Sequence, residues 1–135
     1  MKIVIAGGGR VGSALAARLV TERHQVTVVE KDQATCNRLF EDIGVVTVCG
    51  DANDPRVLDS AGVSGADIAA GVLARDAENL AFATLVRSMS KARVMVRMLD
   101  SRYRAAYRLA GVSELVEEAG WVARWRHGWW PSATR

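Results

Sequence analysis

The sequence predicts an α/β protein with a doubly wound, mainly parallel six-stranded sheet of strand order 3-2-1-4-5-6 and helices on both faces. Short apolar runs alternate with segments of helical periodicity along most of the chain. The first apolar run passes directly into a turn rich in glycine, and several helical segments begin at an acidic residue and end at glycine. Strands buried on both faces have continuous apolar runs, so this alternation indicates repeated βαβ units.

Six segments are predicted to form the strands, namely residues 3–6, 26–29, 45–48, 67–72, 93–98 and 112–116. The first helix follows the glycine turn, with Val11, Leu15, Ala16 and Leu19 on its inner face. Four further helices are predicted between the later strands. One is capped by Asp32, with Cys36, Leu39, Phe40 and Ile43 facing inward, and one is capped by Asp54, with Pro55 at its first helical position. The other two span residues 75–90 and residues 102–110, the last with Ser101 as its cap.

The turn after the first strand carries glycines at the G-x-G-x-x-G spacing, Gly7, Gly9 and Gly12. They would allow a tight turn, a close approach of the backbone to a pyrophosphate, and close packing of the helix on the sheet. The helix N-terminus favours an anion, because its first N–H groups have no intrahelical partner. Glu30 ends the second strand, where a carboxylate would bind ribose hydroxyls and repel a 2′-phosphate. The motif therefore favours NAD(H) or an adenosine nucleotide over NADP, although the glycines alone could form an ordinary turn and Glu30 could simply cap the next helix.

Composition limits the class of protein. The chain has 135 residues, of which 50% are hydrophobic and 24% charged, typical of one globular domain. No apolar stretch is long enough to span a membrane, and no signal peptide precedes the first strand, so we expect a cytoplasmic protein that does not insert into the membrane. Cys36 and Cys49 have no metal-binding spacing and are interpreted as a small apolar helix residue and a strand-end residue. His24 and His127 lie far apart in the sequence, so we expect no metal site.

Charge and aromatic residues are distributed unevenly. Residues 1–86 contain 8 Lys/Arg and 11 Asp/Glu, whereas residues 87–135 contain 10 and 4, within an overall net charge of +3. We therefore divide the chain into a domain of residues 1–116 and a tail of residues 117–135, which holds all four tryptophans. A dimer contact, an amphipathic interfacial segment and a frayed end all remain open for the tail.

The residues above resemble the nucleotide-binding N-terminal domain of potassium-transport regulators, the RCK or KTN domains of Trk-type uptake systems. The resemblance covers residues 1–116. It is carried by Arg10 within the glycine motif, Glu30, the block 50–55 (Gly-Asp-Ala-x-Asp-Pro) and the Asp76-x-x-Asn79 motif. It implies a cytoplasmic, Rossmann-like module that binds NAD(H), ATP or ADP. Such a module would assemble as homodimers or larger rings on a membrane potassium transporter or channel subunit and gate it.

The resemblance also implies which residues bind the nucleotide. Gly7, Gly9 and Gly12 would line the phosphates, Arg10 would pair with them and Glu30 would hold the ribose. Asp51 and Ala52 would lie beside the adenine, Leu73, Ala74 and Asn79 would border the second half of the nucleotide, and Arg97 would meet a terminal phosphate. The candidate cofactor-binding set also includes the neighbouring residues Gly8, Val11 and Lys31.

Three of these residues have alternative interpretations. Arg10 opposes the helix dipole unless an anion is bound, but it could also be a solvated surface residue. Asp51 could accept a hydrogen bond from an adenine amino group, or form an Asx-type turn before Pro55. Arg97 lies in an apolar strand, so it should reach either the ligand crevice or a carboxylate such as Glu30 or Asp76.

We expect no catalytic residues, because hydride transfer needs an acid or base on the substrate side, and no histidine or lysine is placed where it could serve as that group in the predicted crevice. The alternative is a cofactor-binding fragment of an NAD-dependent dehydrogenase. A nucleic-acid module would use the basic C-terminal third, but the crevice is acidic and no motif supports it. Candidate homodimer faces are the helix that starts near Asn79 and the helix of residues 102–110 with Tyr103, Tyr107 and Leu109, although both helices could simply pack on the sheet.

Overall fold

The computed structural model describes residues 1–117, and the tail predicted from residue 117 onward therefore lies almost wholly outside the described residues. Six strands form one sheet in the order β3-β2-β1-β4-β5-β6, and all five pairings are parallel. Their bounds are β1 Lys2–Ala6, β2 Gln25–Glu30, β3 Val46–Cys49, β4 Ile68–Gly71, β5 Arg93–Met98 and β6 Glu114–Glu117. The predicted fold class and strand order are thus confirmed.

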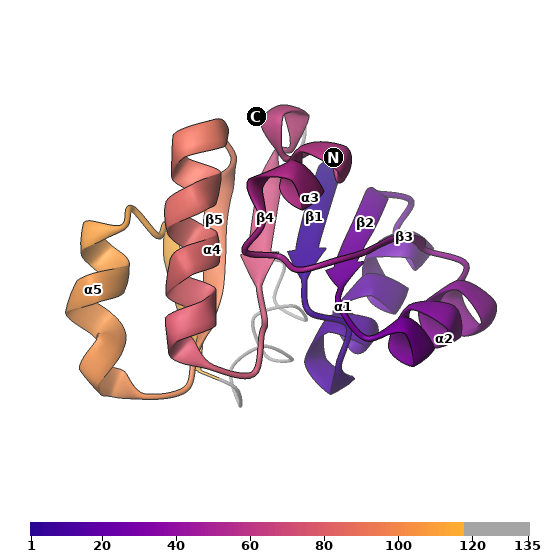
Figure 1. The fold of residues 1–135 in the computed structure, drawn as a ribbon, viewed down its shortest axis with the longest axis horizontal. Helices are drawn as coiled ribbons and strands as arrows, with labels where there is room; N and C mark the ends of the chain where they lie inside the picture. Colours follow the sequence, from indigo (N-terminus) through magenta and orange to yellow (C-terminus); the bar gives the residue numbers. More distant parts are fainter. Residues whose placement is uncertain (118–135) are drawn as a thin grey trace.

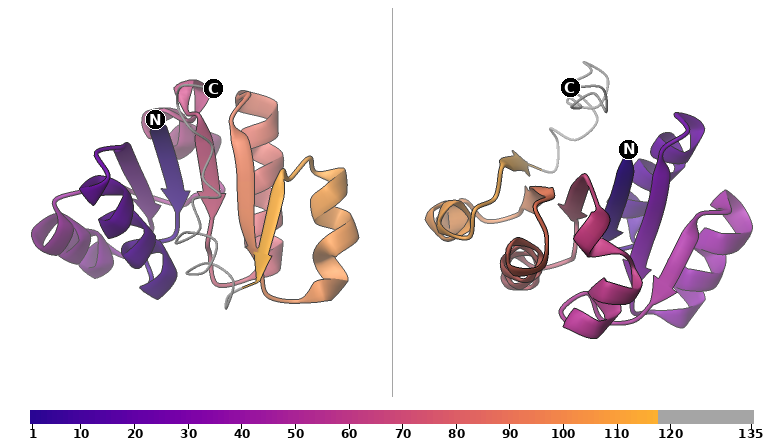
Figure 2. Two further views of the ribbon diagram at one scale, coloured as in Figure 1. Left: turned by 180° about the vertical axis from the view of Figure 1, so that it is seen from behind. Right: turned by 90° about the horizontal axis from the view of Figure 1, so that it is seen from above.

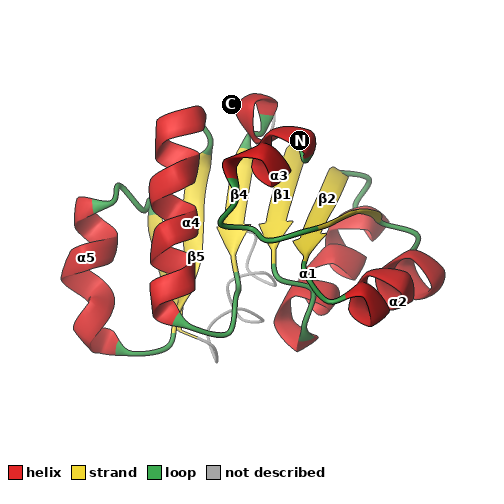
Figure 3. Cartoon of the chain, viewed as in Figure 1, coloured by secondary structure: helices red, strands yellow, loops and turns green. Residues whose placement is uncertain are grey.

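Helices cover both faces of the sheet (Figures 1 and 2). On one face lie α1 (Arg10–Thr21) and α2 (Gln33–Ile43), and on the other lie α3 (Pro55–Ser60), α4 (Asp76–Met89) and α5 (Arg104–Leu109). Short 3₁₀ turns, η1 (Val63–Gly65) and η2 (Ser101–Tyr103), precede β4 and α5. Figure 3 shows that strand and helix alternate through the described chain, as expected of βαβ units.

Alternating residues of each central strand enter two separate cores. Ile3 and Ile5 pack with Leu15, Leu19 and Val28 beneath α1 and α2, whereas the other face of the sheet is covered by a larger cluster. That second cluster is built around the fully buried side chains that follow: Val4, Val29, Leu58, Phe82, Val86, Val94 and Tyr107. Since both faces are buried, the carboxyl ends of the strands are left as the place where a ligand can enter.

Three predictions about individual side chains are wrong. Phe40 is 69% exposed, because the buried stripe of α2 is narrow and Phe40 lies about 100° around the helix from the buried Leu39. Asp100, and not Ser101, caps the segment before α5 by accepting from the Arg102 amide, and the first turn is 3₁₀. Tyr107 is fully buried, so it packs on the sheet and is unavailable for a contact between subunits.

No helix among residues 1–117 combines the length and the apolar character needed to cross a bilayer.

Candidate nucleotide-binding site

The glycine turn is held tightly against its neighbours. Gly7 has a φ of +108°, and a Cβ atom there would lie 2.8 Å from the Val72 carbonyl oxygen. The Gly7 amide donates to the Val29 carbonyl at 2.9 Å, which fixes the turn between β2 and β4. A Cβ atom at Gly12 would overlap the Gly7 carbonyl oxygen. Glycine is therefore required at both positions by contacts within the protein itself.

Gly9 differs from these two glycines. It is the N-cap of α1, no side chain caps the helix there, and a Cβ atom on Gly9 would meet nothing within 4 Å. Arg10 and Val11 follow in the first turn, which contains no acidic residue, and Arg10 is exposed. An uncapped helix N-terminus with open space in front of it suits an anion.

Glu30 connects the glycine turn to the start of α2. Its Oε1 accepts from the Gly8 amide at 2.8 Å and its Oε2 accepts from the Asp32 amide at 2.8 Å. The cap of α2 is Asp32, which accepts from the amide and hydroxyl of Thr35, and these hydrogen bonds hold the pKa of Asp32 below its usual value. Glu30 does not cap α2 itself, and its carboxylate lies beside the loop where a ribose would be expected.

A cavity of about 290 Å³ opens beside the glycine turn, between α1 and α2. Gly8, Gly9 and Arg10 line it from the turn and the start of α1. Arg38 lines it from α2, where its guanidinium donates to the Thr35 hydroxyl at 3.1 Å. No motif in the sequence marks Arg38; the helical spacing of three residues puts it on the same face of α2 as Thr35.

The block after β3 forms a compact turn. The Asp51 carboxylate accepts from the Asn53 amide at 2.8 Å and the Asp51 carbonyl accepts from the Asp54 amide, so Asp51 forms the Asx-type turn considered above. Ala52 is buried, Asp51 is exposed, and Lys31 is exposed beyond the end of β2. The adenine contacts predicted for Asp51 and Ala52 stay predictions.

The distal half of the crevice is built around Asn79. This side chain is fully buried; its Oδ1 accepts from the Leu73 amide at 2.8 Å, and its Nδ2 donates to the carbonyls of Leu73 and Arg97. Arg97 donates in turn to the carbonyls of Val72 at 3.1 Å and Leu73 at 2.7 Å. These carbonyls lie at the crevice end of β4, so Arg97 donates to main-chain oxygens at the predicted edge. Ala74 next to them is exposed.

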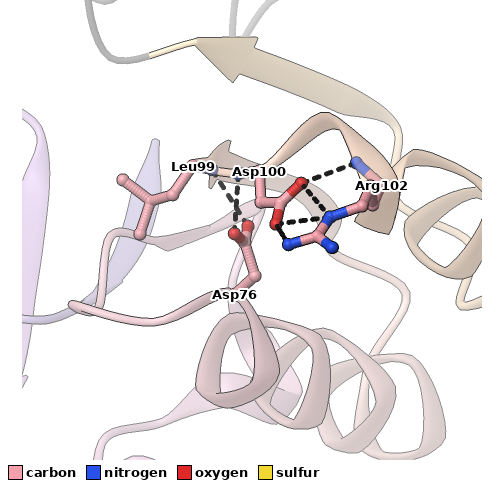
Figure 4. A network of polar contacts seen from close by, with 4 residues as sticks. All are labelled: Asp76, Leu99, Asp100 and Arg102. Atoms are coloured by element: carbon pink, nitrogen blue, oxygen red, sulfur yellow. Dashed lines mark hydrogen bonds and ion pairs between the residues drawn. The ribbon is translucent and has the colours of Figure 1, made fainter.

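Asp76 has a structural role that the Asp76-x-x-Asn79 spacing does not predict. It is 5% exposed, and its carboxylate accepts from the amides of Leu99 at 3.0 Å and Asp100 at 2.8 Å (Figure 4). The Tyr107 hydroxyl also donates to it at 2.6 Å, and burial together with this hydrogen bond raises the pKa of Tyr107. Asp76 thereby fastens the start of α4 to the end of β5 and to α5.

Asp100 lies beside Asp76 and has a different role. Its carboxylate faces the Arg102 side chain, with a shortest contact of 2.7 Å from Nη2 (Figure 4). The hydrogen bonds from the Arg102 side chain and amide lower the pKa of Asp100. Arg102 is exposed and Asp100 is half-buried, so the pair orders the turn before α5 but contributes little to stability compared with Asp76.

The strand order, the glycine turn and the acid at the end of β2 place this chain in the class of Rossmann-like domains. Within that class, the TrkA-N domain family matches residues 3–118, and the chain belongs to this family.

Curated relatives support the same assignment. The chain is 30% identical over 116 residues to a Trk system potassium uptake protein TrkA homolog of Methanothermobacter thermautotrophicus, covering 86% of this chain and 54% of the relative. It is 36% identical over 124 residues to the Trk system potassium uptake protein TrkA of Streptomyces coelicolor, covering 91% and 55%. The chain thus spans about half the length of these relatives.

Solved structures share the fold. The TrkA-N domain of the inner membrane protein ybaL from Escherichia coli has a TM-score of 0.82 at 19% identity, covering 96% of both chains. The GsuK channel bound to NAD has a TM-score of 0.80 at 24% identity, covering 92% of this chain and 22% of that one. A structure of GsuK bound to ADP has a TM-score of 0.79 at 24% identity, covering 92% and 33%.

Proposed function

We propose that this chain is a regulatory domain that binds an adenine nucleotide, NAD(H) or ATP/ADP, and thereby controls a membrane potassium transporter or channel. The observation that carries the proposal is the uncapped, open N-terminus of α1 at Gly9, with the Glu30 carboxylate accepting a hydrogen bond from the amide of the preceding glycine, Gly8. Membership of the TrkA-N family, and relatives described as Trk system potassium uptake proteins, support the regulatory role.

The proposed site has two halves. The first consists of the glycine turn with Arg10 and Val11, which would take the phosphates, and Glu30, which would take the ribose, with Lys31, Asp51 and Ala52 nearby. The second would be the β4–α4 loop with Leu73 and Ala74, together with Asn79 of α4 and Arg97 of β5, whose side chains bind main-chain groups of that loop. Because the Asn79 amide already binds main-chain groups, we propose that it acts by holding the loop in place.

The domain would work without catalysis. The described residues place no histidine at the crevice, because His24 lies before β2 at the opposite edge of the sheet, where its Nδ1 contacts the N-terminal amine. We propose that it acts in the cytoplasm as a homodimer or a larger ring on a membrane potassium transporter or channel subunit, without binding nucleic acid or inserting into the bilayer itself.

Titration of the purified chain with NADH, NAD, ATP, ADP and NADPH, followed by calorimetry and by thermal unfolding, tests the proposal. A nucleotide that binds only the folded state increases the free energy of unfolding, by about 2.7 kcal/mol at a free concentration of a hundred times Kd, and therefore raises the midpoint temperature of unfolding. We expect at least one of the first four to bind and NADPH to bind more weakly. Absence of binding by all five would refute the proposal, and steady NADH-dependent reduction of a substrate would favour a dehydrogenase.

Replacing Glu30 with alanine is expected to weaken NAD(H) binding by about ten- to a hundredfold, because the ribose would lose charge-assisted hydrogen bonds. The same change should narrow the preference for NADH over NADPH, because the charge that repels a 2′-phosphate is gone. Calorimetry with both cofactors measures each effect. The matched control is Glu41→Ala, an exposed carboxylate on α2 that should leave both affinities unchanged. An unaltered NADH-to-NADPH ratio in Glu30→Ala would contradict the assigned role.

A further inference from the structure

The two cysteines of the chain meet beside Glu30, although they come from different elements. Cys36 lies in the first turns of α2, and its thiol donates to the Glu30 carbonyl oxygen at 3.1 Å. Cys49 is the last residue of β3, where it pairs with Glu30 in the parallel register. Its Sγ lies 3.9 Å from the Lys31 carbonyl oxygen. Both thiols therefore lie against the same short stretch of main chain.

The two thiols differ in exposure. Cys36 is buried and Cys49 is exposed. Burial first, and then the adjacent Cys49 thiol, raise the pKa of Cys36 to about 12. Since the thiolate is the nucleophile in exchange reactions, the accessible Cys49 is the thiol that a reagent meets first, and Cys36 is placed to react with it afterwards.

We propose that Cys36 and Cys49 are a redox-active pair that forms an intramolecular disulfide linking α2 to the end of β3. The oxidant is a low-molecular-weight disulfide. The Cys49 thiolate attacks one of its sulfur atoms, forming a mixed disulfide and releasing the first small thiolate. Cys36 then gives its proton to solvent and attacks Cys49 Sγ, releasing the second small thiolate. Two protein thiols are thus oxidised, and one small disulfide is reduced to two thiols.

A disulfide between Cys36 and Cys49 would affect the nucleotide site, because both cysteines lie beside Glu30; this consequence rests on the proposed function. The Glu30 carbonyl accepts from both the Cys36 thiol and the Gly50 amide, while the Glu30 carboxylate accepts from Gly8 and Asp32. Forming the disulfide removes the thiol donor and draws the first turns of α2 towards the strand that leads into Asp51. We expect nucleotide affinity to fall by about three- to tenfold on oxidation and to recover on reduction.

The test uses the full chain incubated with a small-molecule disulfide such as oxidised glutathione, followed by intact-mass measurement, counting of free thiols and non-reducing peptide mapping. The proposal expects a mass about 2 Da below the reduced chain, no free thiol and a Cys36–Cys49 peptide, all reversed by a thiol reductant. Cys49→Ser should block every reaction. Cys36→Ser, which keeps a hydroxyl donor near the Glu30 carbonyl, should stop at the mixed disulfide.

A mixed disulfide that persists on Cys49 in the unsubstituted chain, or two thiols that stay free, would overturn the proposal. Cys36→Ala provides a second variant if the serine at that buried site unfolds the domain. Nucleotide affinity is then measured for the reduced and oxidised chain. If neither form binds any nucleotide, the result counts against the function proposed above, and the mass and peptide map still decide whether the cysteine pair is redox-active.

Discussion

Replacing Gly12 with alanine is expected to abolish nucleotide binding and to destabilise the domain, whereas Gly9→Ala should abolish or weaken binding alone. A Cβ atom at Gly12 overlaps the Gly7 carbonyl, so α1 must move away from the turn. Gly9 has open space around it, and its φ of −71° suits any residue. Alanine at this position should therefore change the free energy of unfolding by no more than about 1 kcal/mol relative to the unsubstituted chain.

The alanine methyl group at position 9 would instead occupy the open space in front of α1, where the nucleotide phosphates are proposed to bind. We therefore expect nucleotide affinity to fall by at least about tenfold. Urea unfolding without nucleotide and calorimetry with nucleotide separate the two effects. If Gly9→Ala binds as tightly as the unsubstituted chain, the phosphates do not lie over this turn. If Gly12→Ala keeps full stability, the close approach of α1 to the turn is not required.

Replacing Asp76 with alanine is expected to lower the free energy of unfolding by about 3–4 kcal/mol, because the buried Tyr107 hydroxyl and two partly buried main-chain N–H groups would lose their acceptor. For a domain of this size the unfolding midpoint should fall by about 10 °C. Thermal and urea unfolding followed by circular dichroism provide the measurement.

Asp100→Ala is the matched control, since it removes a neighbouring carboxylate whose partner, Arg102, is exposed. Asp100→Ala should lower the free energy of unfolding clearly less than Asp76→Ala does. The loss of stability for Tyr107→Phe should lie between these two values, because this change removes one donor and leaves the two main-chain hydrogen bonds to Asp76 intact. Equal losses for Asp76→Ala and Asp100→Ala would show that burial does not govern this network.

The sheet could be predicted from sequence because apolar residues dominate the central strands, and because a segment of helical periodicity separates each strand from the next. Phe40 could not be placed, since hydrophobicity alone does not reveal how wide a buried stripe α2 has. The helix after β5 was predicted with Ser101 as its cap because serine is a common N-cap residue, but the Asp100 carboxylate reaches the Arg102 amide at 2.9 Å and takes that role.

The candidate site was predictable where a motif constrains the backbone and less so where side chains act across elements. Gly7 and Gly12 follow from the turn that they make, and Glu30 from its place at the end of β2. The spacing Asp76-x-x-Asn79 marks the start of α4, but it does not reveal that Asp76 binds amides about 23 residues later in the chain. The meeting of Cys36 and Cys49 likewise depends on the register between β2 and β3, which no local pattern encodes.

One main-chain oxygen has an unusual position between the two halves of the crevice. The Val72 carbonyl is the atom that a Cβ on Gly7 would meet at 2.8 Å, and it also accepts from the Arg97 guanidinium at 3.1 Å. The glycine turn and Arg97 therefore contact the same main-chain oxygen, one from each half of the crevice. A side chain at position 7 would compete for the space around an atom that Arg97 already binds, so the fit of the first half of the crevice also constrains the second.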